Sequence, residues 1–177
     1  MVKYRHRMLI AAVLRDLKLE SPAALLQGDR KMGESKDTVL IMDDEPHVLD
    51  WLIEYLKAKS YKIKIVTNVD EAIKELDKTI FRITIFDLNV PASDVVKKKL
   101  EDKGDVYTKY RGLFAAVYAR TKGHRGRQVI VYSVHDSEEV QNECRRIDIQ
   151  YLIKARPREF KKELNDILSF DPSEKKA

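Results

Sequence analysis

The chain has 177 residues, of which 44% are hydrophobic and 36% are charged, and this composition predicts one folded domain with a heavily charged surface. A single cysteine, Cys144, cannot form an internal disulfide, and no apolar run approaches the roughly 20 residues of a membrane span, so we expect a soluble cytoplasmic protein with no membrane partner. The formal net charge of +5 raises nucleic acid as a partner, but the basic excess gathers in residues 120–127. One small basic patch is more typical of a solvated loop or a protein contact, which leaves nucleic acid as a minor option.

The sequence of residues 1–35 indicates a helical extension that precedes the main domain. Apolar residues recur there at helical spacing, at Ile10, Val13, Leu14 and Leu17, and Ser21 with Pro22 is typical of the start of a second, brief helix. Three interpretations stay open: a docking or dimerisation helix, a helix packed on its own domain, and a segment that is not native sequence. Met32 would make a natural start for the domain that follows.

Residues 38–46 combine a short apolar run with three acids and a proline. The run 38–42 predicts a buried strand, and Pro46 suits the first turn of a helix that we expect to reach about residue 59. Asp43, Asp44 and Glu45 therefore lie at the carboxyl end of a strand, where open α/β sheets bind ligands. Crowded carboxylates are hard oxygen ligands that suit Mg²⁺, although a solvated acidic turn explains this stretch equally well.

Further strands alternate with helices along the rest of the chain. Strands are predicted at 62–67, 80–86, 129–132 and 149–153, with helices after Asn68, around 136–147, and from Pro157 onward. Parallel strands need crossover connections, so five strands in this order predict a doubly wound parallel sheet with helices on both faces. Residues 171–177 are predicted to form a polar tail.

Polar residues stand at the ends of four predicted strands: Asp43 with Asp44, Asp87, Ser133 and Lys154. In a parallel sheet these ends lie along one edge, so carboxylates, a hydroxyl group and an ammonium group are expected to converge. Phosphoryl transfer needs this set, because acids hold Mg²⁺, cations neutralise phosphoryl oxygens, and a carboxylate can act as nucleophile. His124 and His135 are expected on the surface, since no nucleophile–base pair can be argued for either.

Residues 36–170 resemble the receiver domain of two-component response regulators. The resemblance rests on the sequence of residues 39–45, on Asp87 with Pro91 four positions later, on Ser133 at a strand end, and on Tyr151 three positions before Lys154. It covers about three quarters of the chain. It implies a flavodoxin-like five-stranded fold.

The resemblance also implies roles for individual residues. Asp87 would accept a phosphoryl group from a histidine kinase or a phosphotransfer protein, and Asp43, Asp44 and Asp87 would bind Mg²⁺ together with the backbone carbonyl group of Asn89. Such a protein is a switch that can lose its phosphoryl group by its own hydrolysis, and is not a conventional enzyme.

The same resemblance assigns the remaining strand-end residues to signal transmission. Ser133 and Lys154 would bind the phosphoryl oxygens, and their shift would reorient Tyr151. No second domain-sized segment is present for another output, so we expect protein–protein contacts with a downstream target that the sequence does not identify. A homodimer is an open option.

Three features depart from the family pattern. Lys154 is followed by Ala155 and Arg156 rather than directly by proline, and Val134 follows Ser133 where the family favours a smaller residue. The link between the strands at 80–86 and 129–132 contains an insertion at about 92–111, while residues 112–120 are similar to the third helix of the family. In the insertion we expect a short helix that begins after Ser93, contains Val95, Val96 and Leu100, and ends at Gly104.

The insertion leaves the chain beside Asp87, which suggests a lid or a partner-contact element; a tolerated surface excursion is as good an interpretation. The departures also motivate an alternative function, a pseudo-receiver that acts as an interaction module without being phosphorylated. A Mg²⁺-dependent phosphatase is disfavoured because Asp87-Leu88-Asn89 lacks the second acid that its nucleophile motif would need.

Overall fold

The structure, a computed structural model, describes residues 33–154 and 157–169. The predicted helices within residues 1–32 and the predicted polar tail lie outside the described residues. Strand β1 begins at Gly33, ahead of the boundary predicted at residue 36. Its first three residues pair with the start of β3 before a register shift between Ser35 and Val39, and this early pairing has no apolar pattern in the sequence.

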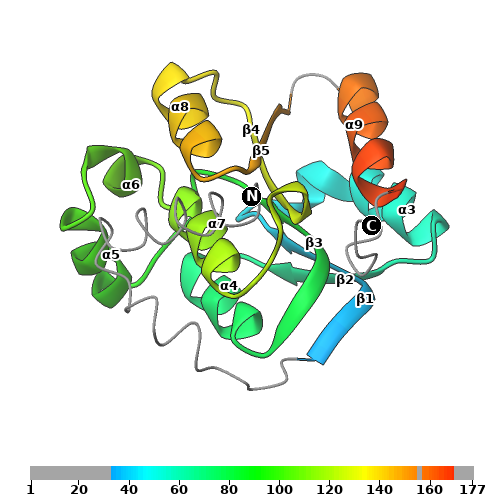
Figure 1. Ribbon diagram of the computed structural model, residues 1–177, viewed down its shortest axis with the longest axis horizontal. Helices are drawn as coiled ribbons and strands as arrows, with labels where there is room; N and C mark the ends of the chain where they lie inside the picture. The colour runs from blue at the N-terminus through cyan, green and yellow to red at the C-terminus, as the bar shows by residue number, and fades with distance from the viewer. Residues whose placement is uncertain (1–32, 155–156, 170–177) are drawn as a thin grey trace, which may run out of the picture.

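Five parallel strands form one sheet, as predicted, and their order in the sheet is β2-β1-β3-β4-β5 (Figure 1). The strands are β1 Gly33–Met42, β2 Lys62–Val66, β3 Thr79–Phe86, β4 Val129–Ser133 and β5 Gln150–Ile153. β1 and β3 lie side by side near the middle of the sheet. β4 pairs with the other edge of β3, with Phe86 opposite Val131. The carboxyl ends of β1, β3, β4 and β5 therefore meet at one edge.

Helices cover both faces of the sheet. On one face, α3 (Asp50–Ala58) and α9 (Pro157–Ser169) bury Leu52, Leu56, Phe160 and Leu164 against alternate residues of β1 and β3. On the other face lie α4 (Val69–Leu76), α7 (Gly112–Thr121) and α8 (Glu138–Arg146), with a second apolar core. Short 3₁₀ helices span Pro46–Leu49 and Gly126–Gln128, so the helix predicted to run from 46 to 59 begins as a 3₁₀ turn.

Side chains cap the helices where the sequence predicts it. The side chain of Asn68 accepts a hydrogen bond from the backbone N–H of Glu71 at the start of α4. Ser93 caps the next helix in the same way, through the N–H of Val96. Each of these contacts satisfies an N–H that has no partner inside its helix.

The predicted insertion forms two short helices, α5 (Asp94–Glu101) and α6 (Asp105–Lys109), which lie beside α7 and far from α9 (Figure 1). Val96 and Leu100 are buried, whereas Val95 is 68% exposed. Gly104 does not end α5, which stops at Glu101; it precedes α6 with a φ of 102°, a conformation that glycine adopts without strain. None of the described helices is long and apolar enough to cross a membrane.

Candidate functional site: a lysine-bridged pair of aspartates

The site contains two aspartates, Asp43 and Asp87, which directly follow the adjacent strands β1 and β3. The backbone N–H of Asp43 donates to the carbonyl group of Val66 (3.1 Å), and that of Asp87 donates to the carbonyl group of Met42 (2.8 Å). These bonds continue the sheet by one residue and place both carboxylates at its carboxyl edge. Asp43 is 2% exposed and Asp87 is 7% exposed, so the two charges require partners inside the protein.

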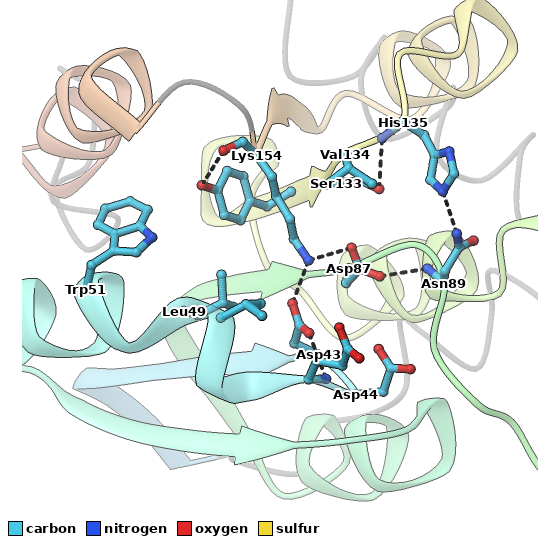
Figure 2. A pocket seen from close by; sticks show the side chains of 13 residues that line it. Asp43, Asp44, Leu49, Trp51, Asp87, Asn89, Ser133, Val134, His135 and Lys154 are labelled. Atoms are coloured by element: carbon cyan, nitrogen blue, oxygen red, sulfur yellow. Dashed lines mark hydrogen bonds and ion pairs between the residues drawn. The ribbon is translucent and has the colours of Figure 1, made fainter.

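Lys154 supplies that partner from the end of β5. Its Nζ lies 2.6 Å from Oδ2 of Asp43 and 2.8 Å from Oδ1 of Asp87 (Figure 2). Burial alone would lower the pKa of Lys154, but the hydrogen bonds and charges of the two aspartates outweigh it and raise that pKa. The backbone N–H of Lys154 also donates to the carbonyl group of Ser133 (2.9 Å), which fixes the root of the side chain.

The other carboxylate oxygens accept hydrogen bonds from the loops that follow each strand. Oδ1 of Asp43 accepts from the backbone N–H of Glu45 (3.0 Å). Oδ2 of Asp87 accepts from the backbone N–H of Asn89 (2.8 Å). Both side chains are therefore held in one orientation by local turns, independently of Lys154.

A cavity of about 420 Å³ opens above these groups. Its lining includes every strand-end residue predicted for the site, namely Asp43, Asp44, Asp87, Asn89, Ser133 and Lys154, together with Trp51, Val134 and His135. Asp44 is exposed, and Val134 is 66% exposed at the cavity wall. The side chains that were scattered over the sequence are thus brought to one place (Figure 2).

The carboxylate and carbonyl oxygens at this site are of the type that Mg²⁺ prefers, but they are too few to surround the ion completely. The described residues contain no group of three histidine, cysteine or acidic side chains that could hold a metal ion. Mg²⁺ usually keeps several waters and binds through one or two carboxylates, so Asp43 and Asp87 with a backbone carbonyl group meet its minimum requirement. The residues present therefore fit the ion.

Ser133 and Tyr151, to which the resemblance assigns phosphoryl contact and signal transmission, lie on the neighbouring strands β4 and β5. Ser133 is fully buried, and its Oγ accepts a hydrogen bond from the backbone N–H of His135 (3.4 Å). Tyr151 is partly buried against the core of the α8 face, and burial of its hydroxyl group raises its pKa. Tyr151 therefore lies on the same side of the sheet as the loop that carries His135.

Of the two histidines expected on the surface, His135 is partly exposed, whereas His124 is buried. His135 is partly buried and lines the cavity, with Nε2 2.5 Å from Nδ2 of Asn89. His124 is 1% exposed: Nε2 accepts from the N–H of Phe81 (2.9 Å) and Nδ1 donates to the carbonyl group of Ala119 (3.0 Å). The surface prediction for His124 was wrong because these backbone partners are remote or irregular and leave no periodic signal.

The basic patch predicted at residues 120–127 is partly internal. Arg120 is buried and donates to the carbonyl groups of Ile147 and His124. Lys122 pairs with Asp77 at 2.6 Å. Two of its four cations are therefore used to join neighbouring elements.

Comparison with known proteins identifies the fold. No protein-family model matches the chain, and a search of curated proteins finds no match. Among solved structures, the BeF3-activated receiver domain of RstA from Klebsiella pneumoniae is similar over 75% of this chain and 99% of that one, with 14% identity and a TM-score of 0.56.

Two further structures give the same result. The response regulator TrrA from Thermotoga maritima, in complex with Mg²⁺ and BeF, is 21% identical over 74% of this chain and 98% of that chain, with a TM-score of 0.55. A CheY-like receiver domain protein from Methanospirillum hungatei is 18% identical over 76% and 95%, with a TM-score of 0.52. The chain is thus a doubly wound, flavodoxin-like α/β protein. More narrowly, residues 33–154 and 157–169 have the fold of response-regulator receiver domains.

Proposed function

We propose that this protein is a phosphorylation-dependent signalling switch, in which Asp87 accepts a phosphoryl group from a histidine kinase or a phosphotransfer protein. One observation carries the proposal: the Lys154 ammonium group lies 2.8 Å from the Asp87 carboxylate, inside a cavity that also contains Asp43. A cation fixed beside a nucleophilic carboxylate is what transfer of an anionic group requires.

The reaction forms one bond and breaks another. An oxygen of Asp87 bonds to phosphorus, the phosphorus–nitrogen bond of the donor phosphohistidine breaks, and its electron pair returns to the imidazole ring. Lys154 neutralises charge on the transferred group, and the Ser133 hydroxyl group, which lines the cavity, donates a hydrogen bond to it. Both residues line the cavity that contains Asp87.

Mg²⁺ would be held by Asp43 and Asp87 with the backbone carbonyl group of Asn89, beside the exposed Asp44 in the lining of the same cavity, and it would supply further positive charge for the phosphoryl oxygens. Asp43 and Asp87 share Lys154 in the structure, so the ammonium group and the ion would divide the task of neutralising them.

The signal would travel from the site along β4 and β5. Lys154, which directly follows β5, is tied to Ser133 through its backbone, and Tyr151 lies three residues before it on β5. A shift of Ser133 and Lys154 toward the phosphoryl group would therefore reorient Tyr151. The face formed by α8, β5 and α9 would present the change to a downstream protein.

A second candidate function is a pseudo-receiver, an interaction module that is not phosphorylated. The same ion pairs favour it, because Lys154 already compensates both buried carboxylates and no group of three metal-binding side chains is found among the described residues. The two candidates differ in whether a phosphodonor labels the protein.

Incubation with a small acyl phosphate, with and without Mg²⁺, tests the choice. We expect Mg²⁺-dependent labelling of the wild type, loss of labelling in Asp87→Asn, and normal labelling in Asp50→Asn, which removes an exposed acid at the start of α3. Unlabelled wild-type protein would favour the pseudo-receiver, and persistent labelling of Asp87→Asn would reject Asp87 as the acceptor.

A further inference from the structure

The insertion lies beside the site rather than over it. No residue of 92–111 lines the cavity, so a lid over Asp87 does not describe its position. Tyr110, which follows α6, instead packs against the loop between β4 and α8. This loop carries His135, and through it the insertion reaches the cavity wall.

Tyr110 makes a ring contact with His135. The ring centroids are 5.8 Å apart at an interplanar angle of 61°, an edge-to-face arrangement. Tyr110 is 5% exposed, so its ring is packed against neighbouring residues. A hydrogen bond with Ser137 of the same loop lowers the pKa of the Tyr110 hydroxyl group, which gives the ring a second attachment there.

His135 in turn touches the loop that holds Asp87. Its Nε2 lies 2.5 Å from Nδ2 of Asn89, and the backbone N–H of Asn89 donates to Oδ2 of Asp87. Figure 2 shows His135 and Asn89 side by side at one side of the cavity, with Lys154 on the other side of Asp87. A chain of direct contacts therefore runs from Tyr110 to the carboxylate.

Hydrogen bonds anchor the chain on both sides of Tyr110, at Tyr107 and at Arg111. The Tyr107 hydroxyl group donates to Glu143 on α8, and Glu143 also accepts from Arg146. On the other side, Nε of Arg111 donates to the carbonyl group of Val90 (2.9 Å). Tyr110 lies between these anchors, so its ring is held against His135 by the insertion and not by the loop alone.

We propose that Tyr110 is a positioning residue, which keeps His135 against Asn89 and thereby slows hydrolysis of a phosphoryl group on Asp87; this inference rests on the proposed function. In that hydrolysis a water oxygen bonds to phosphorus, the bond from phosphorus to the Asp87 oxygen breaks, and its electron pair returns to the carboxylate. Inorganic phosphate leaves and a proton passes to solvent. The water must come close to phosphorus, and the His135–Asn89 pair occupies one side of that space.

The test measures the lifetime of the aspartyl phosphate after the donor is removed. Tyr110→Leu and His135→Ala are each expected to shorten the lifetime by about threefold or more, a barrier change of about 0.7 kcal/mol. The lifetime in the double variant should be no shorter than that in the more affected single variant, because both changes break the same chain of contacts. Tyr110→Phe keeps the ring and should retain the wild-type lifetime. Tyr118→Leu is the matched control, since Tyr118 contacts Phe114 and Asp77 and does not line the cavity.

Unchanged lifetimes in Tyr110→Leu or His135→Ala, or fully additive effects in the double variant, would overturn the proposal. If Tyr110→Leu fails to fold, the lifetime in His135→Ala decides, and an unchanged lifetime there overturns the proposal. A second measurement needs no phosphorylation: the NMR signals of the Asn89 side-chain amide in Tyr110→Leu should move toward those in His135→Ala. Unlabelled wild-type protein would refute the proposed function, whereas labelled protein with unmoved Asn89 signals would refute this inference.

Discussion

The ammonium group of Lys154 lies 2.6 Å from the carboxylate of Asp43, although 111 residues separate the two in the chain. Only 14% of the lysine side chain and 3% of the aspartate side chain are exposed. The fold therefore buries a cation between two carboxylates at the edge where four strands end. The cost of removing these charges from water is offset only when all three groups are present. Loss of one group should therefore lower the free energy of unfolding.

Lys154→Met is expected to lower the free energy of unfolding by about 3 kcal/mol, because it leaves Asp43 and Asp87 buried without a cation. Urea denaturation without divalent cations measures the loss. Adding Asp87→Asn to this variant should recover part of it, since only one buried charge then remains.

Lys162→Met is the control for that experiment, because Lys162 is exposed on α9 and its removal should change stability by less than about 0.5 kcal/mol. If Lys154→Met and Lys162→Met denature at the same urea concentration, the bridge does not stabilise the folded protein.

Trp51 offers a direct measure of ion binding. It is the only tryptophan of the chain and lines the same cavity as Asp43 and Asp87. We expect Mg²⁺ to change its fluorescence in a saturable way, and Asp43→Asn to weaken the apparent affinity by at least about tenfold. Asp166→Asn, an exposed acid on α9, should leave the titration unchanged. A flat titration of the wild-type protein would count against Mg²⁺ binding.

The sequence predicts the sheet and the convergence of the site because both follow from local patterns. Apolar runs end at Asp43 and Asp87, and parallel topology brings such ends together. Contacts that join remote segments leave no such pattern. The bond from Phe81 to His124 and the contact between Asn89 and His135 connect residues 43 and 46 positions apart, and neither could be predicted from spacing.

Gly112 tests how closely α7 supports the acceptor loop. A Cβ at this position would lie 1.8 Å from the backbone oxygen of Asp87, and the N–H of Gly112 donates to the carbonyl group of Leu88. Gly112→Ala should therefore displace the backbone at Asp87, lower stability by about 1–3 kcal/mol, and sharply reduce phosphodonor labelling.

Gly104→Ala is the comparison for this variant. It should cost about 1–2 kcal/mol through strain at a φ of 102°, but nothing lies within 4 Å of its Cβ, so labelling should persist. Equal labelling of the two variants would show that the close contact at Gly112 does not control the site.

His124 gives the protein a pH dependence that is independent of the site. Burial, which disfavours the charged imidazolium, is the main cause that lowers its pKa from 6.5 to about 4, and the charge of Arg120 lowers it further. Above pH 6.5 the histidine is neutral in both the folded and the unfolded chain. Between pH 6.5 and about 4 only the unfolded chain binds the proton. The free energy of unfolding therefore decreases as the pH is lowered, by up to about 1.4 kcal/mol per pH unit and about 3 kcal/mol in total. Urea denaturation from pH 7.5 to 4.5 should show a stability advantage of the wild type over His124→Gln that is constant down to about pH 6.5 and shrinks steadily below it. A constant difference between wild type and His124→Gln would mean that His124 takes up a proton in the folded state as readily as in the unfolded chain.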